Sequence, residues 1–426
     1  MHAPLAPQLR TEWRSLDALA AIADEWRALA ARTVEPNVFY EPAFALAAAP
    51  VFGTGAGATL VWSASGRLMG LFPGRIERGH AGAQTAIAGW THPYAPLGVP
   101  LVDRDEPEAV IAAWLDKIGT DSGLLALSYI PEQGAFARAL DAVLAQSGRQ
   151  HATFGRHERA LLDPGADRAG YLDRAVSSGK RKEIRRQRRR LEEMAPVTFI
   201  TTRQAQNAEA ALKDFLVLEA SGWKGIAGTA AANDATIRAF VESAVTGLAA
   251  HGQARIDRMF LNGQPIAVCV TLISGGTAWC WKIAYSEGVS RYSPGVQLVF
   301  ELTGNVLADQ SIARVDSCAT AGHPMIDHVW RERLTVSDRL IELKPQALPF
   351  AWTCKLEELR RTAIAKAKAM RDNFRTTKSA PVAKQTPDDL AGCRHRHLVD
   401  KGDLARVLVR REARANEALD VARERV

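Results

Sequence analysis

The chain has 426 residues, of which 47% are hydrophobic and 24% are charged, so it can bury a large core and form about two or three domains. No apolar run approaches the roughly 20 residues that a membrane-spanning helix needs. The start of the chain lacks the layout of a signal peptide, so we expect a soluble, cytoplasmic protein without a transmembrane segment. The five cysteines are scattered and make no C-x-x-C pair, which argues against a disulfide scaffold or a metal site.

Helices and strands alternate in the first half of the chain. The pattern predicts helices at 15–31, 106–118 and 134–146, a turn into a short helix at 37–42, strands at 59–63, 68–76 and 124–130, and a long loop with short strands at 79–100. We place the end of this first domain near residue 165. The fold class that this alternation predicts is α/β, with mixed sheets flanked by helices.

The second half repeats the alternation. It predicts helices at 178–194, 206–220 and 234–250, strands at 197–201, 254–260, 265–273 and 279–285, a helix that begins near residue 294, and a strand near 314–318. Beyond about residue 350 a basic tail follows, with a helical pattern at 355–376, a linker at 376–387 and a charged helix at 404–426. The predicted domains are therefore residues 1–165, 166–350 and 351–426.

Two hairpins correspond between the halves. Ser65-Gly66 and Asn262-Gly263 each end a turn between apolar strands, and Asn-Gly is among the strongest short hairpin patterns. Chance similarity explains such a pair equally well. If the correspondence is real, the two halves are duplicated α/β domains.

The stretch around residues 279–297 indicates a binding site. Strict alternation would place four large side chains on one face of the strand, Trp279, Trp281, Ile283 and Tyr285, and three residues on the other, Cys280, Lys282 and Ala284. Ser293 then stands at the N-cap of a helix and Pro294 at its first position. The free amides of Gly295, Val296 and Gln297, aided by the helix dipole, are suited to a pyrophosphate. An ordinary β–α–β crossover has the same pattern.

A strongly basic helix is predicted between Lys180 and Arg190, where cationic residues surround a narrow apolar stripe of Ile184, Leu191 and Met194. A solvated charged face is the simplest explanation. The alternatives are phosphate recognition on a donor, docking of an acidic carrier protein, binding of RNA such as tRNA, or contact with an anionic membrane surface.

Several motifs of the second half form a recognisable series. They are SGKRKEIRR at 178–186, LEASGWKG at 218–225, GTA at 228–230, NGQPIA at 262–267, WKIAYSE at 281–287 and YSPG at 292–295. Over residues 178–333 this series resembles the FemAB-like branch of the GNAT acyltransferases, particularly the CelD-like acetyltransferases of cellulose and exopolysaccharide synthesis. The first half, with FYEPAF at 39–44, resembles the degenerate N-terminal domain of such proteins.

The resemblance implies two tandem GNAT-like domains and transfer of an acyl group from acyl-coenzyme A, as co-substrate, to the amine or hydroxyl of a small molecule or saccharide. It implies no tightly bound cofactor. The usual phosphate-loop pattern, R/Q-x-x-G-x-G/A, is only partly present, since residues 291–296 supply a single glycine. An aminoacyl-tRNA donor, as in the Fem transferases, therefore stays open. We favour coenzyme A because backbone amides and one cation, Arg291, suffice for the phosphates.

Direct transfer needs a general base for the acceptor. The candidates are Asp316, which leads, Glu219 and His323, while Tyr285 is a candidate acid toward the leaving thiolate. The expected substrate-binding residues are Trp223, Lys224, Trp281, Lys282, Tyr292 and Trp330, with the glycine-rich residues 223–229 as a mobile loop on the acceptor side. No Gly-x-Ser-x-Gly, His-Glu-x-x-His or Walker lysine motif is present, which argues against hydrolases, zinc proteases and nucleoside triphosphatases. The competing class is a GNAT-like binding protein that has lost catalysis.

Overall fold

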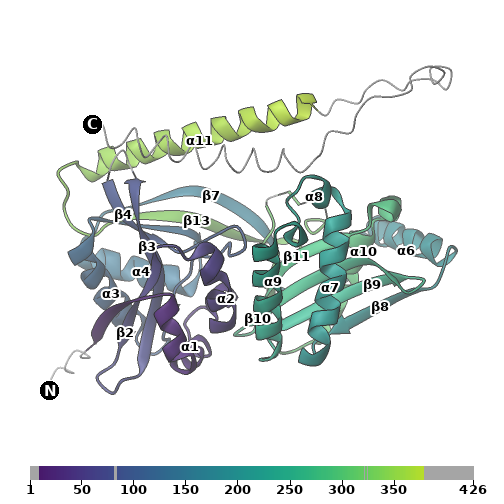
Figure 1. Ribbon diagram of the computed structural model, residues 1–426, viewed down its shortest axis with the longest axis horizontal. Helices are drawn as coiled ribbons and strands as arrows, with labels where there is room; N and C mark the ends of the chain where they lie inside the picture. Colours follow the sequence, from purple (N-terminus) through teal and green to yellow (C-terminus); the bar gives the residue numbers. More distant parts are fainter. Residues whose placement is uncertain (1–8, 81–83, 321, 324, 379–426) are drawn as a thin grey trace. The chain divides into compact units, whose positions relative to one another are not determined.

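The computed structural model describes residues 9–80, 84–320, 322–323 and 325–378. The chain divides into two compact units, Met1–Thr362 and Ala363–Val426. The first unit holds the strands and most of the helices, and its sheet and helices position the candidate site (Figure 1).

The first unit is built on one mixed sheet. Among the described residues it has 13 strands in the order β1-β2-β3-β4-β6-β13-β7-β12-β11-β10-β9-β8, with β5 paired to β3 at the side. The strands are β1 (Arg10–Ser15), β2 (Ala56–Trp62), β3 (Leu68–His80), β4 (Gln84–Gly89), β5 (Leu101–Val102), β6 (Leu124–Pro131), β7 (His151–Leu162), β8 (Val197–Thr202), β9 (Ala254–Leu261), β10 (Gln264–Ser274), β11 (Thr277–Tyr285), β12 (Arg314–Asp316) and β13 (Glu332–Glu342).

Helices cover both faces of this sheet. They are α1 (Ala23–Ala30), α2 (Pro42–Phe52), α3 (Pro107–Asp121), α4 (Ala135–Ser147), α5 (Tyr171–Ala175), α6 (Ser178–Glu192), α7 (Ala205–Ser221), α8 (Trp223–Ile226), α9 (Ala235–Ala249), α10 (Pro294–Ala308) and α11 (Phe350–Lys378), with short 3₁₀ turns at Asp17–Ile22, Val38–Tyr40, Ala231–Asn233 and Glu287–Tyr292. No helix in the part of the chain described here is both long and apolar enough to cross a membrane.

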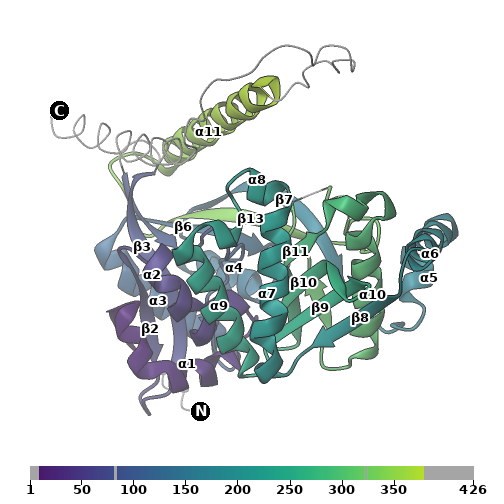
Figure 2. The same cartoon turned by 45° about the vertical axis from the view of Figure 1, so that its right-hand side comes forward.

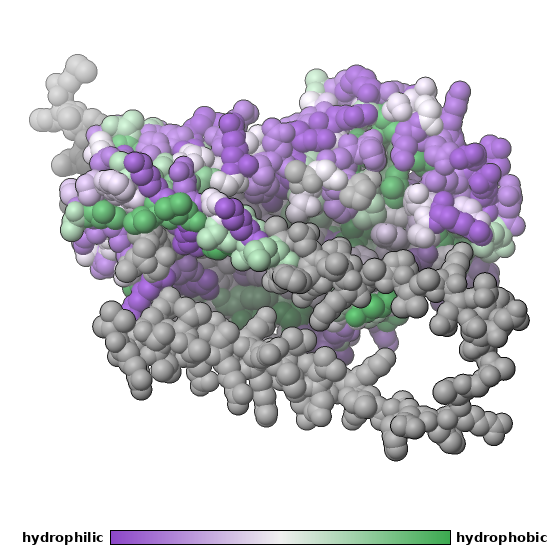
Figure 3. Space-filling view, turned by 90° about the horizontal axis from the view of Figure 1, so that it is seen from above, coloured by the Kyte–Doolittle hydropathy of each residue, from purple (hydrophilic) through white to green (hydrophobic). Residues whose placement is uncertain are grey.

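Strand β10 shows how the sheet separates two cores. Val268, Val270 and Leu272 pack with α7 and α9 in one cluster, whereas Ala267 and Cys269 pack with α10 in the other. Figures 1 and 2 accordingly show α7 and α9 on one side of β9–β11 and α10 on the other. Burial on both faces requires a nearly continuous apolar run, which is why this strand was predictable. In the view of Figure 3, hydrophilic side chains cover most of the surface and only short hydrophobic patches interrupt them.

The mixed α/β fold class is confirmed, as are most of the predicted helices and strands. Both predicted hairpins are present. At the first, Gly66 has φ 81°, and at the second, Asn262 and Gly263 have φ 50° and 75°, the left-handed backbone that such two-residue turns require. Whether the two halves superpose remains a prediction.

Four strands were not predicted, β1, β5, β7 and β13, and two of them, β7 and β13, join the halves. β13 lies between β6 and β7, so a strand from late in the sequence is inserted among strands of the first half. β7 and β13 carry charged residues along much of their length, and neither shows a clean apolar alternation. β1 lacks such an alternation too. The predicted loop with short strands at 79–100 is confirmed by the short strand β4, although β3 continues to His80.

The domain boundary near residue 165 remains a proposal. It falls just after β7, within the same compact unit. The predicted helix at 355–376 lies within α11. The linker beyond residue 378 and the helix at 404–426 lie outside the described residues.

Candidate active site

The site begins where two parallel strands separate. β11 and β12 are paired through only three positions, Thr277 with Arg314, Ala278 with Val315, and Trp279 with Asp316. β12 ends there, while β11 continues to Tyr285. The edge of β11 that faces away from β10 therefore has no strand partner beyond Trp279 among the described residues, and its backbone groups are left for a ligand.

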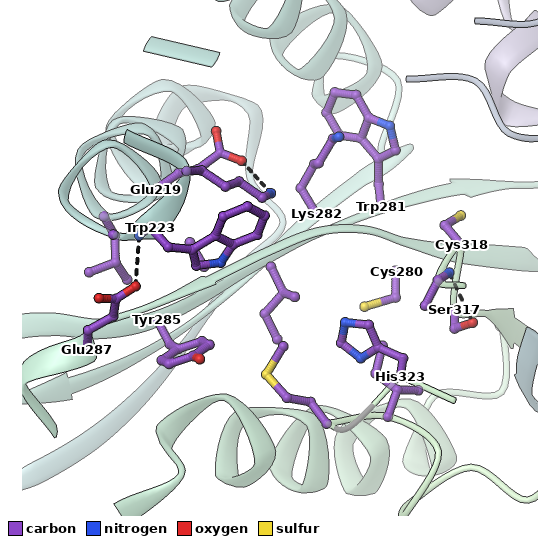
Figure 4. Close-up of a pocket in the computed structure, with 18 residues that line it drawn as sticks. Glu219, Trp223, Cys280, Trp281, Lys282, Tyr285, Glu287, Ser317, Cys318 and His323 are labelled. Carbon is purple, nitrogen blue, oxygen red and sulfur yellow. Dashed lines mark hydrogen bonds and ion pairs between the residues drawn. The ribbon is translucent and has the colours of Figure 1, made fainter. Parts of the chain in front are cut away.

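A cavity of about 230 Å³ opens at this separation (Figure 4). Its walls are residues 280–285 of β11, residues 317–319 after β12, the end of α7 with the start of α8, and His323, Met325 and Ile326. Seven predicted site residues line it: Glu219, Trp223, Lys224, Trp281, Lys282, Tyr285 and His323.

The predicted alternation along β11 was wrong at its middle. The pairing with β10 shifts between Val270 and Thr271, so Trp281 is an extra residue, a β-bulge. Trp279 and Trp281 pack in one cluster, while Ile283 and Tyr285 pack against the other. The bulge therefore changes which faces of the strand these side chains occupy. Nothing in the local sequence marks it, since bulges depend on the partner strand.

Two carboxylates bind the segment 223–231, which follows α7 beside the cavity. Glu219, which is buried, accepts hydrogen bonds from Lys224 Nζ at 2.8 Å and from the amide of Ala231 at 2.9 Å. Glu287 accepts from the amide of Trp223 at 2.7 Å. The indole of Trp223 stays 60% exposed at the rim. Glu287 was not predicted, although its place directly after β11 put it near the site.

His323 and Tyr285 are the cavity groups suited to proton transfer. Burial lowers the pKa of His323 below its ordinary value, and nearby Lys224 lowers it further while Asp327 opposes the shift. The imidazole is thus neutral at neutral pH. Its buried Nδ1 has no hydrogen-bond partner within the described residues. Tyr285 lies beside the start of α10, where a β-carbon added at Gly295 would be 3.4 Å from its ring.

Lys282 is the unusual cation of the site. Its Nζ lies 4.0 Å from the centre of the Tyr94 ring, a cation–π contact with the first half of the chain. Trp281 makes a second link to the same residue, since its Nε1 donates to the Tyr94 carbonyl at 2.8 Å. Burial lowers the pKa of Lys282 to about 8, and Lys224 contributes in the same direction. Burial also raises the pKa of Tyr94 to about 12.

The thiols of the cavity are not activated. A hydrogen bond with Cys269, whose sulfur is 3.3 Å away, and burial raise the pKa of Cys280 well above its ordinary value. Burial does the same for Cys318. Because the thiolate is the reactive form, an acyl-cysteine route is disfavoured and direct transfer is favoured.

The start of α10 lies next to the cavity, since a β-carbon added at Gly295 would approach Met325 and Tyr285, two residues of the cavity walls. Ser293 is the N-cap with φ 51°, although its side chain makes no capping hydrogen bond, and Pro294 is the first helical residue, as predicted. The amide of Gln297 is bonded to the Ser293 carbonyl, whereas those of Gly295 and Val296 have no acceptor within the described residues. Arg291 stacks on Tyr292 at 4.7 Å, next to this helix start. Val296 and Gln297 are buried.

Nine predicted residues are not among the cavity walls. Six of them make up the expected phosphate site at and just before the start of α10: Arg291, Ser293, Pro294, Gly295, Val296 and Gln297. The other three are Asp316, Trp330 and Tyr292. Asp316 is buried in an ion pair with Arg159, with Arg159 Nη2 2.6 Å from Asp316 Oδ2. Trp330 is fully buried and donates to Thr303 Oγ1 at 2.8 Å. Tyr292 is not among the cavity walls, and its carbonyl accepts from the Gln297 side chain at 2.8 Å.

The basic helix α6 is held by two of the three residues of its predicted apolar stripe, since Ile184 and Leu191 are buried. The third, Met194, lies beyond the end of the helix and is exposed, so that part of the prediction was wrong. Three of its arginines have carboxylate partners: Arg181 with Asp173, Arg186 with Glu183 and Arg188 with Glu192. Lys182, Arg185 and Arg189, spaced three and four residues apart, share an exposed face and have no carboxylate partner among the described residues.

Comparisons with known proteins give distant similarities in fold and a family match. No curated protein matches the sequence. Among solved structures, a conserved protein from Bacteroides thetaiotaomicron is 10% identical, with a TM-score of 0.51 and coverage of 79% of this chain and 100% of that one. FemX is 10% identical (TM-score 0.49, 75% and 95% covered), and a tandem GNAT protein from the clavulanic acid biosynthesis pathway is 14% identical (TM-score 0.41, 80% and 100% covered).

The family comparison covers part of the chain. The model of the acetyltransferase (GNAT) domain matches residues 178–323, a span that includes α6, α7, β11, α10 and all seven predicted residues that line the cavity. The chain therefore carries a GNAT-type acyltransferase domain over residues 178–323, with its candidate site between β11 and β12.

Proposed function

We propose that the protein transfers an acyl group from acyl-coenzyme A to the amine or hydroxyl of a small molecule or saccharide. The observation that carries this proposal is the separation of β11 from β12 beside the start of α10. The unpaired edge of β11 suits the amide-containing arm of coenzyme A, which would bind as an added strand does. The free amides of Gly295 and Val296, with Arg291 nearby, suit its pyrophosphate.

The reaction is direct. The acceptor nitrogen or oxygen attacks the thioester carbonyl carbon and forms the new bond, His323 takes the proton that the acceptor loses, and the carbon–sulfur bond then breaks. Tyr285 gives a proton to the departing thiolate. We choose His323 over the other candidates because it is neutral and lines the cavity, whereas Glu219 is bonded to Lys224 and Ala231, and Asp316 to Arg159.

A saccharide acceptor is supported by two observations. The exposed indole of Trp223 stands at the rim of the cavity, where an aromatic face can pack against a sugar ring. The sequence motifs resemble those of acetyltransferases from cellulose and exopolysaccharide synthesis.

A second candidate is an aminoacyl-tRNA donor. The observation that favours it is the exposed face of α6, where Lys182, Arg185 and Arg189 lack carboxylate partners among the described residues. Acidic carrier proteins and anionic membrane surfaces are the other partners that this face suits. Loss of catalysis, with binding alone retained, is the third candidate.

The test is acyl transfer by the full chain. Acetyl-coenzyme A is incubated with pooled amino sugars, hydroxylated saccharides and amines, and acetylated products are sought by mass spectrometry. The proposal predicts a product that forms with the wild type and falls at least about 100-fold with His323→Gln, as expected for loss of a general base. Product formation only with aminoacyl-tRNA would support the second candidate.

A further inference from the structure

The charges around the cavity restrict the acceptor. Two ammonium groups, those of Lys224 and Lys282, line it, and their mutual repulsion contributes to the lowered pKa of Lys282. Glu219 opposes this shift, but both cavity carboxylates already accept hydrogen bonds from other groups. Glu219 is bonded to Lys224 and the amide of Ala231, and Glu287 is bonded to the amide of Trp223.

Lys282 has no anionic partner of its own. Among the described residues its ammonium forms no ion pair or hydrogen bond. Its Nζ lies 4.0 Å from the centre of the Tyr94 ring and 5.7 Å from that of the Trp281 ring. An ammonium has three N–H donors. A largely enclosed cation without acceptors is costly, and a bound anion would remove that cost. Lys224 has further N–H donors beyond the one that bonds Glu219.

We propose that the acceptor carries an oxyanion group, a carboxylate or a phosphate, which Lys282 and Lys224 bind inside the cavity. The inference deepens the proposed function and rests on it, since it specifies the acceptor of the same reaction. A simple amine is itself a cation at neutral pH, so Lys282, which has no carboxylate partner among the described residues, would repel it. An acceptor with an acidic group compensates that repulsion and brings its nucleophile into the cavity that His323 also lines.

The binding of an anion can be measured without any acyl transfer. The full chain is labelled briefly with acetic anhydride, with no coenzyme A thioester present, and the labelled fraction of Lys282 is read by peptide mass spectrometry. Only the uncharged amine of Lys282 reacts with the reagent. At a pH below the pKa of Lys282, an anion that raises this pKa by about one unit therefore lowers the labelling about tenfold. Lys213, which is exposed on α7, serves as the internal control.

Four probes are compared in two pairs: O-phosphoethanolamine with ethanolamine, and β-alanine with β-alaninamide. We expect at least one acidic probe to protect Lys282 about tenfold, its partner without the acid to give no protection, and Lys213 to be unaffected. Protection by one acidic probe alone identifies the anion as phosphate or carboxylate. Equal labelling with and without the acidic probes, or equal protection by their non-acidic partners, overturns the inference.

A second arm separates this inference from the proposed function. In a transfer assay with an acidic acceptor, Lys282→Gln should raise the KM for the acceptor about tenfold or more and leave acetyl-coenzyme A binding unchanged, whereas Lys282→Arg should restore part of the loss. An unchanged KM would overturn the inference while leaving acyl transfer in place. Protection of Lys282 without any transfer would count against the proposed function alone.

Discussion

Arg159 and Asp316 form a buried ion pair that joins β7 to β12, with 2.6 Å between Arg159 Nη2 and Asp316 Oδ2. Arg159 also donates to the Pro96 carbonyl, and Asp316 accepts from the amide of Cys318, a residue of the cavity wall. The pair thus fixes the strand end from which the cavity opens.

The first prediction concerns this pair. Asp316→Asn leaves the Arg159 charge buried without its partner, so the free energy of unfolding should fall by about 3–5 kcal/mol. Urea denaturation measures this. Glu242→Gln, which removes the exposed partner of Arg238 on α9, is the control and should change stability by less than about 1 kcal/mol. Full stability with lost turnover would instead support Asp316 as the base.

The second prediction concerns His323. Because its folded-state pKa lies below 6.5, the imidazole stays a competent base as the pH falls through 6.5, and the acid limb of kcat/KM should lie below that pH. His323→Gln should lower kcat about 100-fold or more and abolish this limb. The profile is measured with the acceptor found above. An acid limb that persists unchanged in His323→Gln would assign the base elsewhere.

The third prediction concerns stability in acid. His92 stacks on Phe52 with 4.2 Å between ring centres, and burial lowers its pKa to about 3. Between pH 6.5 and 3 the unfolded chain binds a proton here that the folded chain does not. The free energy of unfolding therefore falls as the pH falls through this window. Between pH 7 and pH 5 the stability of His92→Phe, measured by thermal unfolding, should fall less than that of the wild type. An equal fall in both proteins would contradict this prediction.

The fourth prediction concerns α6. Changing Arg185 and Arg189 to Gln should preserve folding, since Gln is a comparable helix former, and should weaken binding of tRNA or another polyanion most strongly at low salt. Changing Lys213 and Arg238 to Gln removes the same charge from α7 and α9 and is the control. Equal weakening by both pairs would indicate a general charge effect and no binding role for α6.

The sequence was most informative where local chemistry determines structure. The Pro294 helix start, the Asn262-Gly263 turn and the apolar run of β10 each depend on near neighbours in the chain, and each was predicted correctly. The placement of β13 between β6 and β7 depends on pairing between strands far apart in the sequence, and charged side chains obscure its alternation.

The site was predictable to a similar extent. Lys282 was named from the motif at 281–287 and His323 as a candidate general base, and both line the cavity. The β-bulge at Trp281 and the pairing of Asp316 with Arg159 arise only from tertiary contacts, so no local pattern revealed them. Tyr94, which approaches Lys282 from the first half, was missed for the same reason.

The most direct test of the account is equilibrium binding of acetyl-coenzyme A to two variants of α10. A β-carbon at Gly295 would lie 2.5 Å from Met325 Sδ, whereas one at Gly304 would have no neighbour nearer than Leu172 at 4.0 Å. By titration calorimetry, we predict that the wild type and Gly304→Val bind acetyl-coenzyme A at one site per chain, and that Gly295→Val binds it at least about tenfold more weakly because its side chain crowds the phosphate amides. No binding by the wild type, or equal affinity for all three, would contradict a coenzyme A site at the separation of β11 and β12.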